Sequence, residues 1–417
     1  MDRRRLIYII LFVILCFAIG FAIYRVFFYK GEAPVTPGIP SAGLPGEFPA
    51  AGEGRIPGQI AQPSGELPGS NLVPAQPGAI VAPGAGQAPL LPERDSQKKL
   101  VEYITDVAAV NAAPSKTGGV KFYNQLDGKF YIIDADGNIH ALSDEVFYNV
   151  EKVTWSPVKD ESIIEYPDGA NIYYDFNSKK QVTLPKHWEE FSFSHLGNEI
   201  AAKSIGLSPE NRWLVASNPD GTQTRAIEAL GDNANKVDVD WSPNQQVVAL
   251  SRTGEPLGTR QEVLLVGLNQ ENFKSITVEG RGFESIWSPS GGKLLHSVYN
   301  GRNDYKPELW IVDANPSSAG ANRRLLNVNT WAHKCTMVDE RFAYCAVPEI
   351  MDIGAGFAPS LSDDTPDRLI KIDTVTGSKT ELPTEGMHTI DSIFMGDNGK
   401  TIYFTDKHQS GIFKISI

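Results

Sequence analysis

Residues 285–296 read SIWSPSGGKLLH, a short apolar run followed by a Trp-Ser-Pro turn and a second apolar run. The same order returns at 153–166, where VTWSP leads to SIIEY, and at 239–250, where VDWSP leads to VVAL. Short apolar runs separated by Pro, Gly, Asn and Asp are typical of β-hairpins. Weaker copies occur at 191–202, 336–344 and 392–404, and a third apolar run follows most copies. Because the unit recurs, the sequence predicts an all-β fold built from repeated antiparallel sheets.

The repeat resembles a known family. A Trp-Ser-Pro turn with a following glycine, then an apolar strand, then a strand ending in Asp, is similar to the TolB-type, WD-like repeat of β-propellers. Trp155, Trp241 and Trp287 carry the motif here, and among these three copies only the last has the glycine, Gly291. The resemblance implies a β-propeller over roughly 320 residues. It implies no particular activity, because such repeats serve binding, scaffolding and enzyme domains. TolB has an α/β domain before its propeller that is not expected here, so its partners are not carried over.

The length of the repeat region predicts the number of blades. The 319 residues from Lys99 to Ile417 divide into seven units of about 46 or six of about 53, and WD-like blades have roughly 40–45. Seven blades are favoured over six for a domain at 97–417. The last copy supplies only three strands, so residues 100–104 are expected to add its outer strand and close the ring. The first complete blade is then expected to begin with an inner strand at 107–110.

An uncharged apolar run, Leu6–Tyr24, lies near the N-terminus. Nineteen helical residues span about 28 Å, close to the thickness of a hydrocarbon core. Arg3–Arg5 precede the run, and the positive-inside rule favours a cytoplasmic segment 1–5, a transmembrane helix within 6–28 and an exported remainder. A cleaved signal peptide is the alternative.

Residues 29–96 are rich in Pro and Gly. Between Gly31 and Glu93, thirteen residues are Pro and twelve are Gly. A chain with more than roughly 25–30% Pro plus Gly and no strict period is expected to be disordered. We therefore expect a flexible linker that tethers the domain at 97–417 outside the cytoplasm. The sequence has no Asn-x-Ser/Thr acceptor, which favours a bacterial cell over a glycosylated ectodomain.

Composition excludes several classes of protein. The sequence has 50 acidic and 38 basic residues, a net charge of −12, which argues against a nucleic-acid partner. Three cysteines are too few for a disulfide scaffold or a multi-cysteine metal module. The expected partner is a protein or a cell-envelope glycan, and we predict no cofactor and no metal site.

The connections between the second and third strands of a unit are the longest in the domain. They reach 252–261, 299–307 and 348–367, and they share one face of a propeller with the links between blades. Long loops on a rigid scaffold commonly carry function. The predicted binding residues on this face are Arg252, Arg260, Arg302, Asp304, Tyr305, Asp363, Asp364 and Asp367.

Two cysteines, Cys335 and Cys345, flank a predicted hairpin. If the hairpin loop has three residues, the two cysteines lie opposite each other and could form a disulfide in an exported domain. A two-residue turn would instead place Cys335 opposite Tyr344. A zinc site that includes His333 is a third possibility.

The sequence lacks the motifs of common catalytic sites, G-x-S-x-G, H-E-x-x-H and G-x-x-x-x-G-K-[ST]. We therefore expect a non-catalytic protein-binding or envelope-assembly module. The alternative is a propeller hydrolase or lyase acting on a glycan or lactone in the central channel, which needs convergent carboxylates. A purely structural domain is also open, and an exposed apolar patch on the loop face would argue against it.

Overall fold

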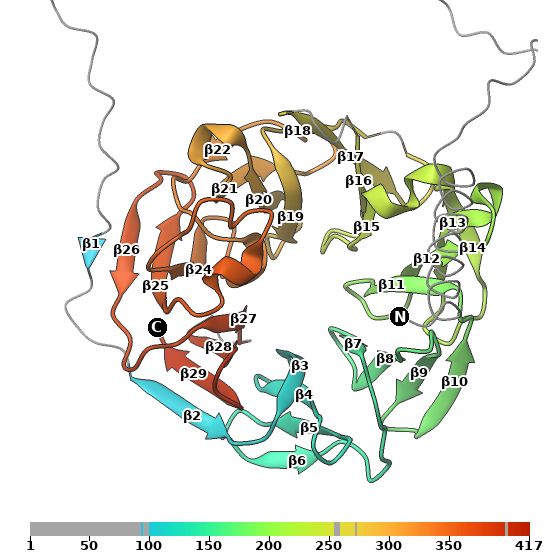
Figure 1. Ribbon diagram of the computed structural model, residues 1–417. Coiled ribbons are helices and arrows are strands. Elements are labelled where there is room, and N and C mark those ends of the chain that lie inside the picture. The colour runs from blue at the N-terminus through green and yellow to red at the C-terminus, as the bar shows by residue number, and fades with distance from the viewer. Residues whose placement is uncertain (1–92, 95–99, 254–258, 272, 397–398) are drawn as a thin grey trace, which may run out of the picture. The chain divides into compact units, whose positions relative to one another are not determined.

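Seven antiparallel sheets, each with four strands of the repeat, surround a central axis (Figure 1). The computed structural model describes residues 93–94, 100–253, 259–271, 273–396 and 399–417. The predicted all-β, seven-bladed propeller is therefore confirmed. The transmembrane helix predicted within 6–28 and nearly all of the linker predicted at 29–96 lie outside the described residues. In the part of the chain that the structure describes, no helix has the length and apolarity needed to cross a membrane.

Each blade runs from an inner strand beside the axis to an outer strand at the rim. Blade 1 contains β3 (Ala109–Pro114), β4 (Val120–Asn124), β5 (Lys129–Ile133) and β6 (Ile139–Ala141). Blade 2 contains β7 (Lys152–Trp155), β8 (Glu161–Glu165), β9 (Asn171–Asp175) and β10 (Lys180–Leu184). Blade 3 contains β11 (Trp188–Phe193), β12 (Ile200–Ile205), β13 (Arg212–Ser217) and β14 (Arg225–Ala229). Blade 4 contains β15 (Val237–Val239), β16 (Val247–Arg252), β17 (Gln261–Gly267) and β18 (Ile276–Val278).

The remaining blades follow in chain order. Blade 5 contains β19 (Arg281–Trp287), β20 (Lys293–Tyr299), β21 (Pro307–Asp313) and β22 (Arg324–Leu325). Blade 6 contains β23 (Cys335–Met337), β24 (Phe342–Pro348), β25 (Asp367–Asp373) and β26 (Lys379–Leu382), with β1 (Glu93–Arg94) added in parallel outside β26. Blade 7 contains β27 (Ile390–Met395), β28 (Thr401–Asp406), β29 (Ile412–Ser416) and β2 (Val101–Thr105). Five 3₁₀ turns lie in connections: η1 (Pro209–Asn211), η2 (Gly231–Lys236), η3 (Gly301–Asn303), η4 (Ala332–Lys334) and η5 (Pro359–Ser362).

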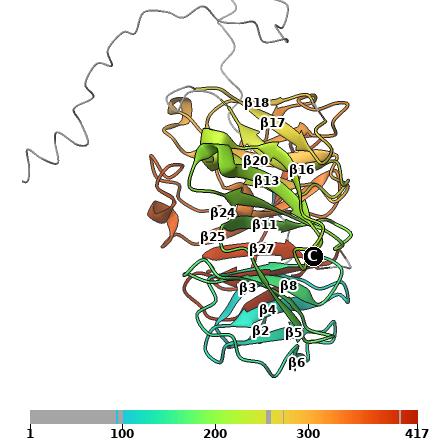
Figure 2. The same ribbon diagram turned by 90° about the vertical axis from the view of Figure 1, so that its right-hand side faces the viewer.

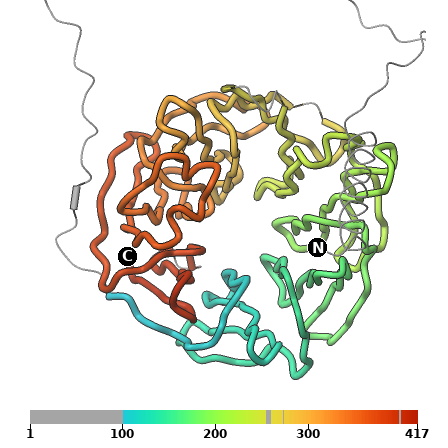
Figure 3. The backbone as a smooth tube through the Cα atoms, in the orientation of Figure 1, coloured from blue at the N-terminus to red at the C-terminus, as the bar shows by residue number. Residues whose placement is uncertain are grey.

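Strand β2 closes the ring. It pairs antiparallel with β29, with Val101 opposite Ile415 and Tyr103 opposite Phe413. The tube view shows the two ends of the domain meeting in this blade (Figure 3). The closure expected from residues 100–104 is therefore present, shifted by one residue. It covers the edge that β29 would otherwise expose to other chains.

In two of the three Trp-Ser-Pro copies the serine stabilises the hairpin, whereas the Ser156 hydroxyl of the first copy has no partner among the described residues. Ser242 and Ser288 are completely buried, and their hydroxyls accept the N–H of Val247 at 2.9 Å and of Lys293 at 2.9 Å. Each serine thus caps the strand that follows the turn. Gly291 has a left-handed φ of 71°, and Gln245 takes the same place in its own copy at φ 65°, so the missing glycine does not change the turn.

Cys335 and Cys345 form a disulfide between β23 and β24. Met337 pairs with Ala343, and Val338 N donates to Phe342 O, so the hairpin loop has three residues. Both cysteines are buried in an apolar cluster between blades 5 and 6. The disulfide uses the two thiols that a zinc site with His333 would require.

The connections divide between two faces of the ring. The turns between the first and second and between the third and fourth strands lie on one face, which we call the turn face. The connections between the second and third strands lie with the links between blades on the opposite face, which we call the loop face. Seen from the side, the segment at 349–366 stands out from the loop face (Figure 2).

Candidate functional site

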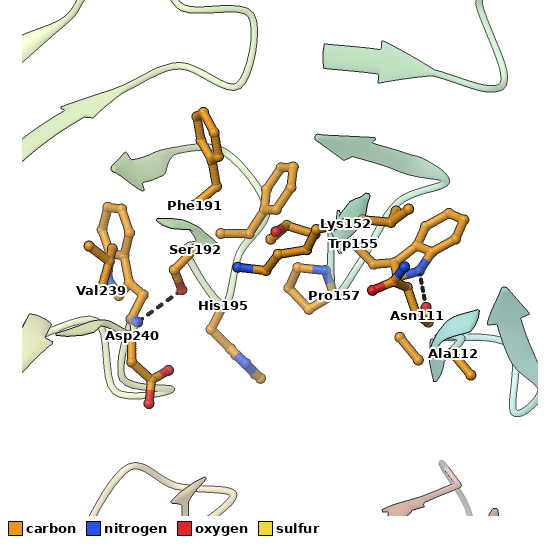
Figure 4. A pocket seen from close by; sticks show the side chains of 15 residues that line it. Asn111, Ala112, Lys152, Trp155, Pro157, Phe191, Ser192, His195, Val239 and Asp240 are labelled. Carbon is orange, nitrogen blue, oxygen red and sulfur yellow. Dashed lines mark hydrogen bonds between the residues drawn. The ribbon is translucent and has the colours of Figure 1, made fainter. Parts of the chain in front are cut away.

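The central channel contains a cavity of about 530 Å³ (Figure 4). Its wall comes from the inner strands of four consecutive blades, β3, β7, β11 and β15, and from the residues that follow β7, β11 and β15. We call it the axial cavity. Its volume lies in the range of small-ligand sites. Figure 4 shows the Asp240 carboxylate and the His195 imidazole pointing toward the same open side.

Hydrogen bonds between blades hold the wall of the axial cavity. Trp155 Nε1 donates to Asn111 O at 2.7 Å, and Asn111 occupies the bulge of β3 with a left-handed φ of 52°. Trp241 N donates to Ser192 Oγ at 3.0 Å, which ties blade 4 to blade 3. Wall positions are therefore fixed by contacts between neighbouring blades.

Several polar groups of this wall have no partner. Trp241 is 5% exposed, and its indole N–H has no acceptor within the described chain. The side chains of Asn111 and His195 form no hydrogen bond with any residue that the structure describes. Buried polar groups are usually hydrogen bonded, and the buried Trp241 N–H is an exception. The exposed His195 side chain can reach water or a ligand.

Asp240 has unusual electrostatics in this cavity. Burial raises its pKa to about 7, and the nearby Asp238 carboxylate adds to the rise. The indole N–H of Trp287 lies beside Asp240 and partly offsets this rise in pKa, although it is too poorly aligned to form a hydrogen bond. The Asp240 carboxyl group therefore changes charge near neutral pH, whereas an exposed Asp titrates near 4.

Four other carboxylates close to the axis lie in ion pairs. The pairs are Glu165 with Lys152, Glu190 with Lys203, Asp238 with Arg252, and Glu284 with His333. Of these five acidic groups, Asp240 alone lacks a cationic partner among the described residues. No cluster of three or more His, Cys, Asp or Glu able to hold a metal occurs in the described part of the chain. Glu189 of β11 and Asp391 of β27, both exposed on inner strands, also have no cationic partner among the described residues.

Replacing Asp240 by asparagine is expected to stabilise the protein at alkaline pH. The pKa of Asp240 is about 7 in the folded state and about 4 in the unfolded state. The ionised carboxylate therefore destabilises the folded protein, and this loss of stability grows as the pH rises from about 4 to about 7. D240N should therefore raise the free energy of unfolding by about 2–4 kcal/mol at pH 8 and leave it unchanged at pH 4. Urea unfolding at both pH values measures the difference. Equal stability of both proteins at pH 8 would show that the ionised carboxylate is fully compensated.

Three arginines gather around Glu279, two of them from loop-face connections and Arg323 from the residue before β22. Arg260, Arg323 and Arg302 lie 2.8, 3.1 and 3.7 Å from the carboxylate of Glu279. Hydrogen bonding from Arg260 is the main cause that lowers the pKa of Glu279. We call this group the basic cluster. It brings together two predicted binding residues, Arg260 and Arg302, from neighbouring blades.

An apolar ridge stands next to the basic cluster. It consists of Tyr305, Ile350, Ile353, Phe357 and Leu361, all exposed. Gly354 N donates to Asp304 O and Gly356 N to Tyr305 O, both at 2.8 Å, so the long connection of blade 6 is bound to that of blade 5. The Phe357 ring packs edge-on against Tyr305 at 5.7 Å between centroids. The ridge is thus presented in a fixed conformation.

The remaining predicted residues have different surroundings. Arg252 pairs with Asp238 at 3.3 Å and donates to backbone oxygens of the preceding connection, so it braces blade 4. Asp363 pairs with Lys407, and Asp364 is almost fully exposed beside His408. Asp367 is buried and bound to Lys334, so it cannot contact a ligand at the loop face.

Exposed large apolar side chains favour one face of the ring. Ten of them lie in loop-face connections: Leu126, Val146, Tyr148, Leu207, Tyr305, Ile350, Ile353, Phe357, Leu361 and Met387. Two, Leu196 and Val375, lie in turn-face connections, and Leu100 lies at the same face directly before β2. Single exposed apolar residues are ordinary, but their concentration on one face marks a contact surface.

The sequence predicted one residue of the ridge, Tyr305, but not its other four residues or Asp240. Residues 348–367 contain both apolar residues and the acidic segment at 363–367, and only the acidic segment was predicted to bind. The sequence does mark Asp240, because among the three Trp-Ser-Pro copies only this one has a carboxylate directly before the Trp.

No protein-family model and no curated protein matches this sequence. Solved structures match it by fold. The β-propeller domain of Myceliophteria thermophila Cps50 (Swd1) superposes with a TM-score of 0.52 at 12% identity, covering 77% of this chain and 100% of that one. An oligogalacturonate lyase in complex with manganese superposes with a TM-score of 0.50 at 12% identity, and the match covers 78% of this chain and 98% of the lyase.

The tricorn protease gives a TM-score of 0.50 at 11% identity and covers 78% of this chain, which spans only 34% of the protease's length. At such low identity the likeness concerns the fold. The chain is therefore similar in architecture to proteins as unlike as a protease and a lyase, and what they share with it is the β-propeller.

Proposed function

We propose that this chain is a non-catalytic recognition module of a bacterial cell envelope. A transmembrane helix and a linker hold the propeller outside the cytoplasm, and the loop face binds a protein partner. The observation that carries the proposal is the distribution of exposed apolar side chains, ten on the loop face against three on the turn face. A purely structural domain has no need of such a face.

The ridge has the properties of a protein-binding surface. Aromatic and aliphatic anchors that are already fixed lose little conformational entropy on binding. Phe357 is held by Tyr305 and by Tyr299, whose ring lies 6.0 Å away between centroids. Backbone hydrogen bonds to the neighbouring blade fix the loop that carries it. The ridge is therefore ready to bind without first becoming ordered.

Charge indicates the chemistry of the partner. The chain has a net charge of −12, yet three guanidinium groups share one carboxylate beside the ridge. Arg302 and Tyr305 belong to the same connection of blade 5, so the basic cluster flanks the ridge directly. The partner surface is expected to have an apolar centre and acidic residues at its margin.

The position of β2 supports this orientation. Val101 pairs with Ile415, next to the C-terminal end of β29, so the chain enters the ring at the turn face. The preceding strand β1 lies outside β26 at the rim of blade 6, so neither described N-terminal strand lies over the loop face.

Charged substitutions in the ridge are expected to abolish partner binding. Ile353 and Phe357 are 71% and 61% exposed, so I353D/F357D changes the surface without burying a charge. We expect it to weaken capture of the partner by about 100-fold or more, because two apolar anchors are lost. The matched control is L196D/V375D on the turn face, where the side chains are 61% and 51% exposed.

The full-length chain would be immobilised in detergent and incubated with solubilised envelope proteins. The proteins that it retains would be quantified by mass spectrometry. A protein retained by the wild type and by L196D/V375D, but not by I353D/F357D, supports the proposal. Equal retention by both double variants would place the binding surface elsewhere.

A further inference from the structure

We propose that the partner of the loop face is a second copy of this chain, bound ridge to ridge about a two-fold axis. This inference rests on the proposed function, because it names the protein that the ridge would bind. The surface around the ridge is self-complementary, with a basic side at blades 4 and 5 and an acidic side near blade 7. A two-fold dimer requires such a surface, because each copy presents the same patch to the other.

The basic side of the ridge has an excess of positive charge. Arg260, Arg302 and Arg323 share the single carboxylate of Glu279, so three positive charges meet one negative charge. The side chains of Arg260 and Arg302 are 65% and 68% exposed. Arg302 lies three residues before Tyr305 in the same connection, so a partner that covers Tyr305 of the ridge also meets this charge.

The acidic side lies where the long connection of blade 6 approaches blade 7. Asp364 lies three residues after Leu361 of the ridge, and its side chain is 98% exposed. Glu385, in the link between β26 and β27, is also exposed. Thr389 Oγ1 donates to Thr365 O at 3.3 Å, which joins this link to the end of the long connection. Neither Asp364 nor Glu385 has a lysine or arginine partner within the described chain.

A two-fold axis through the ridge matches these charges. Blades 5, 6 and 7 follow one another around the ring, so the basic cluster and Asp364 lie on opposite sides of the ridge (Figure 1). When two loop faces meet about an axis that runs from the ring centre through the ridge to the rim, the basic side of each copy faces the acidic side of the other. The apolar residues of the two ridges then meet at the centre of the contact, and the charges pair at its margin.

Other classes of partner fit this surface less well. A uniformly acidic protein or an anionic lipid surface would be attracted to the basic cluster but repelled by Asp364 and Glu385. A uniformly basic partner would be repelled by Arg260 and Arg302. The partner therefore needs an apolar centre with one acidic and one basic side, which is the pattern that the chain itself presents.

The test exchanges charges in the full-length chain in detergent. R260E/R302E makes the basic side acidic, and D364K/E385K makes the acidic side basic, both by changing exposed side chains. Sedimentation velocity over a range of concentrations measures dimerisation. We expect each variant alone to dimerise about tenfold more weakly than the wild type, or worse, because like charges then face each other. An equimolar mixture should recover the wild-type affinity to within about threefold, because every contact in the mixed dimer joins opposite charges again.

Recovery in the mixture shows that both variants are folded. It cannot come from residues 1–96, which are unchanged in every sample. The turn-face control L196D/V375D should dimerise as the wild type does, and I353D/F357D should be monomeric. The inference is overturned if the wild type is monomeric at micromolar concentration, or if the mixture dimerises no better than either variant alone.

The proposed function can fail independently of this inference. A monomeric wild type that captures another envelope protein, and loses it in I353D/F357D, overturns only the second copy as the partner. Capture of envelope proteins that is equal in I353D/F357D and L196D/V375D overturns the proposed function itself, and with it the inference that rests on the ridge.

Discussion

Replacing Lys334 by methionine is expected to lower the free energy of unfolding by about 3–5 kcal/mol at pH 7. Lys334 ends η4, and its ammonium lies 2.9 and 2.8 Å from the two carboxylate oxygens of Asp367, with both side chains buried. Methionine keeps the apolar stem but removes the charge, so the Asp367 carboxylate would remain buried without a cation. Guanidinium unfolding followed by tryptophan fluorescence measures the loss.

A double variant separates lost charge from lost packing. Asp367 also accepts the N–H of Ile390 at 2.7 Å, the first residue of the inner strand of blade 7. In K334M/D367N the amide oxygen can still accept this N–H, and no charge is left buried. We expect this variant to lose less than about 2 kcal/mol. If it is as unstable as K334M, the packing of the lysine stem and not the ion pair is responsible.

The pH dependence of K334M provides a second test. Burial raises the pKa of Asp367, and Lys334 opposes this rise only in part. A carboxyl group with a raised folded-state pKa destabilises the protein progressively as pH rises from its unfolded value of about 4. Removing Lys334 raises this pKa further, so K334M should lose much stability at pH 7 and little at pH 4. A loss of equal size at both pH values contradicts this account.

The fold could be predicted from sequence because each repeat carries its own local signal. The Ser242 and Ser288 hydroxyls cap the strand that follows their turn, so the hairpin is specified within about ten residues. Strand ends were less predictable. The first inner strand was expected at 107–110, but β3 spans Ala109–Pro114, because a bulge at Asn111 keeps it in register with β4.

The candidate sites depend on contacts between blades, which no single repeat encodes. The length of 348–367 identified the loop, but the exposure of Phe357 follows from hydrogen bonds to the connection of blade 5. The raised pKa of Asp240 likewise depends on the folded surroundings, because burial is its main cause, and Trp287 of the next blade acts in the opposite direction. Of the predicted residues, Arg260 and Arg302 meet at Glu279, whereas Asp367 is buried beneath the loop face.

A chain that begins at residue 106 is expected to lose roughly 5 kcal/mol relative to one that begins at residue 100, because the backbone pairing of β2 disappears. Tyr103 packs against Phe413 at 5.2 Å between ring centroids, and Glu102 pairs with Lys414 at 2.9 Å. Without β2, the edge of β29 becomes available for pairing with other chains, so self-association is expected as well. Thermal unfolding and light scattering measure the two effects.

Adding β2 back as a peptide tests whether the loss of ring closure causes the lower stability and the self-association of the shorter chain. A synthetic peptide of residues 100–105 can occupy the edge of β29 in the register of Val101 with Ile415, so it should bind the shorter chain and recover part of its stability. A peptide with proline in place of Tyr103 cannot complete the ladder and serves as the control. The longer chain already has its own β2, so it should bind neither peptide. If the chain from residue 106 is monomeric and as stable as the longer chain, then contacts between the inner strands of blades 7 and 1 hold the ring together, and β2 only covers its edge.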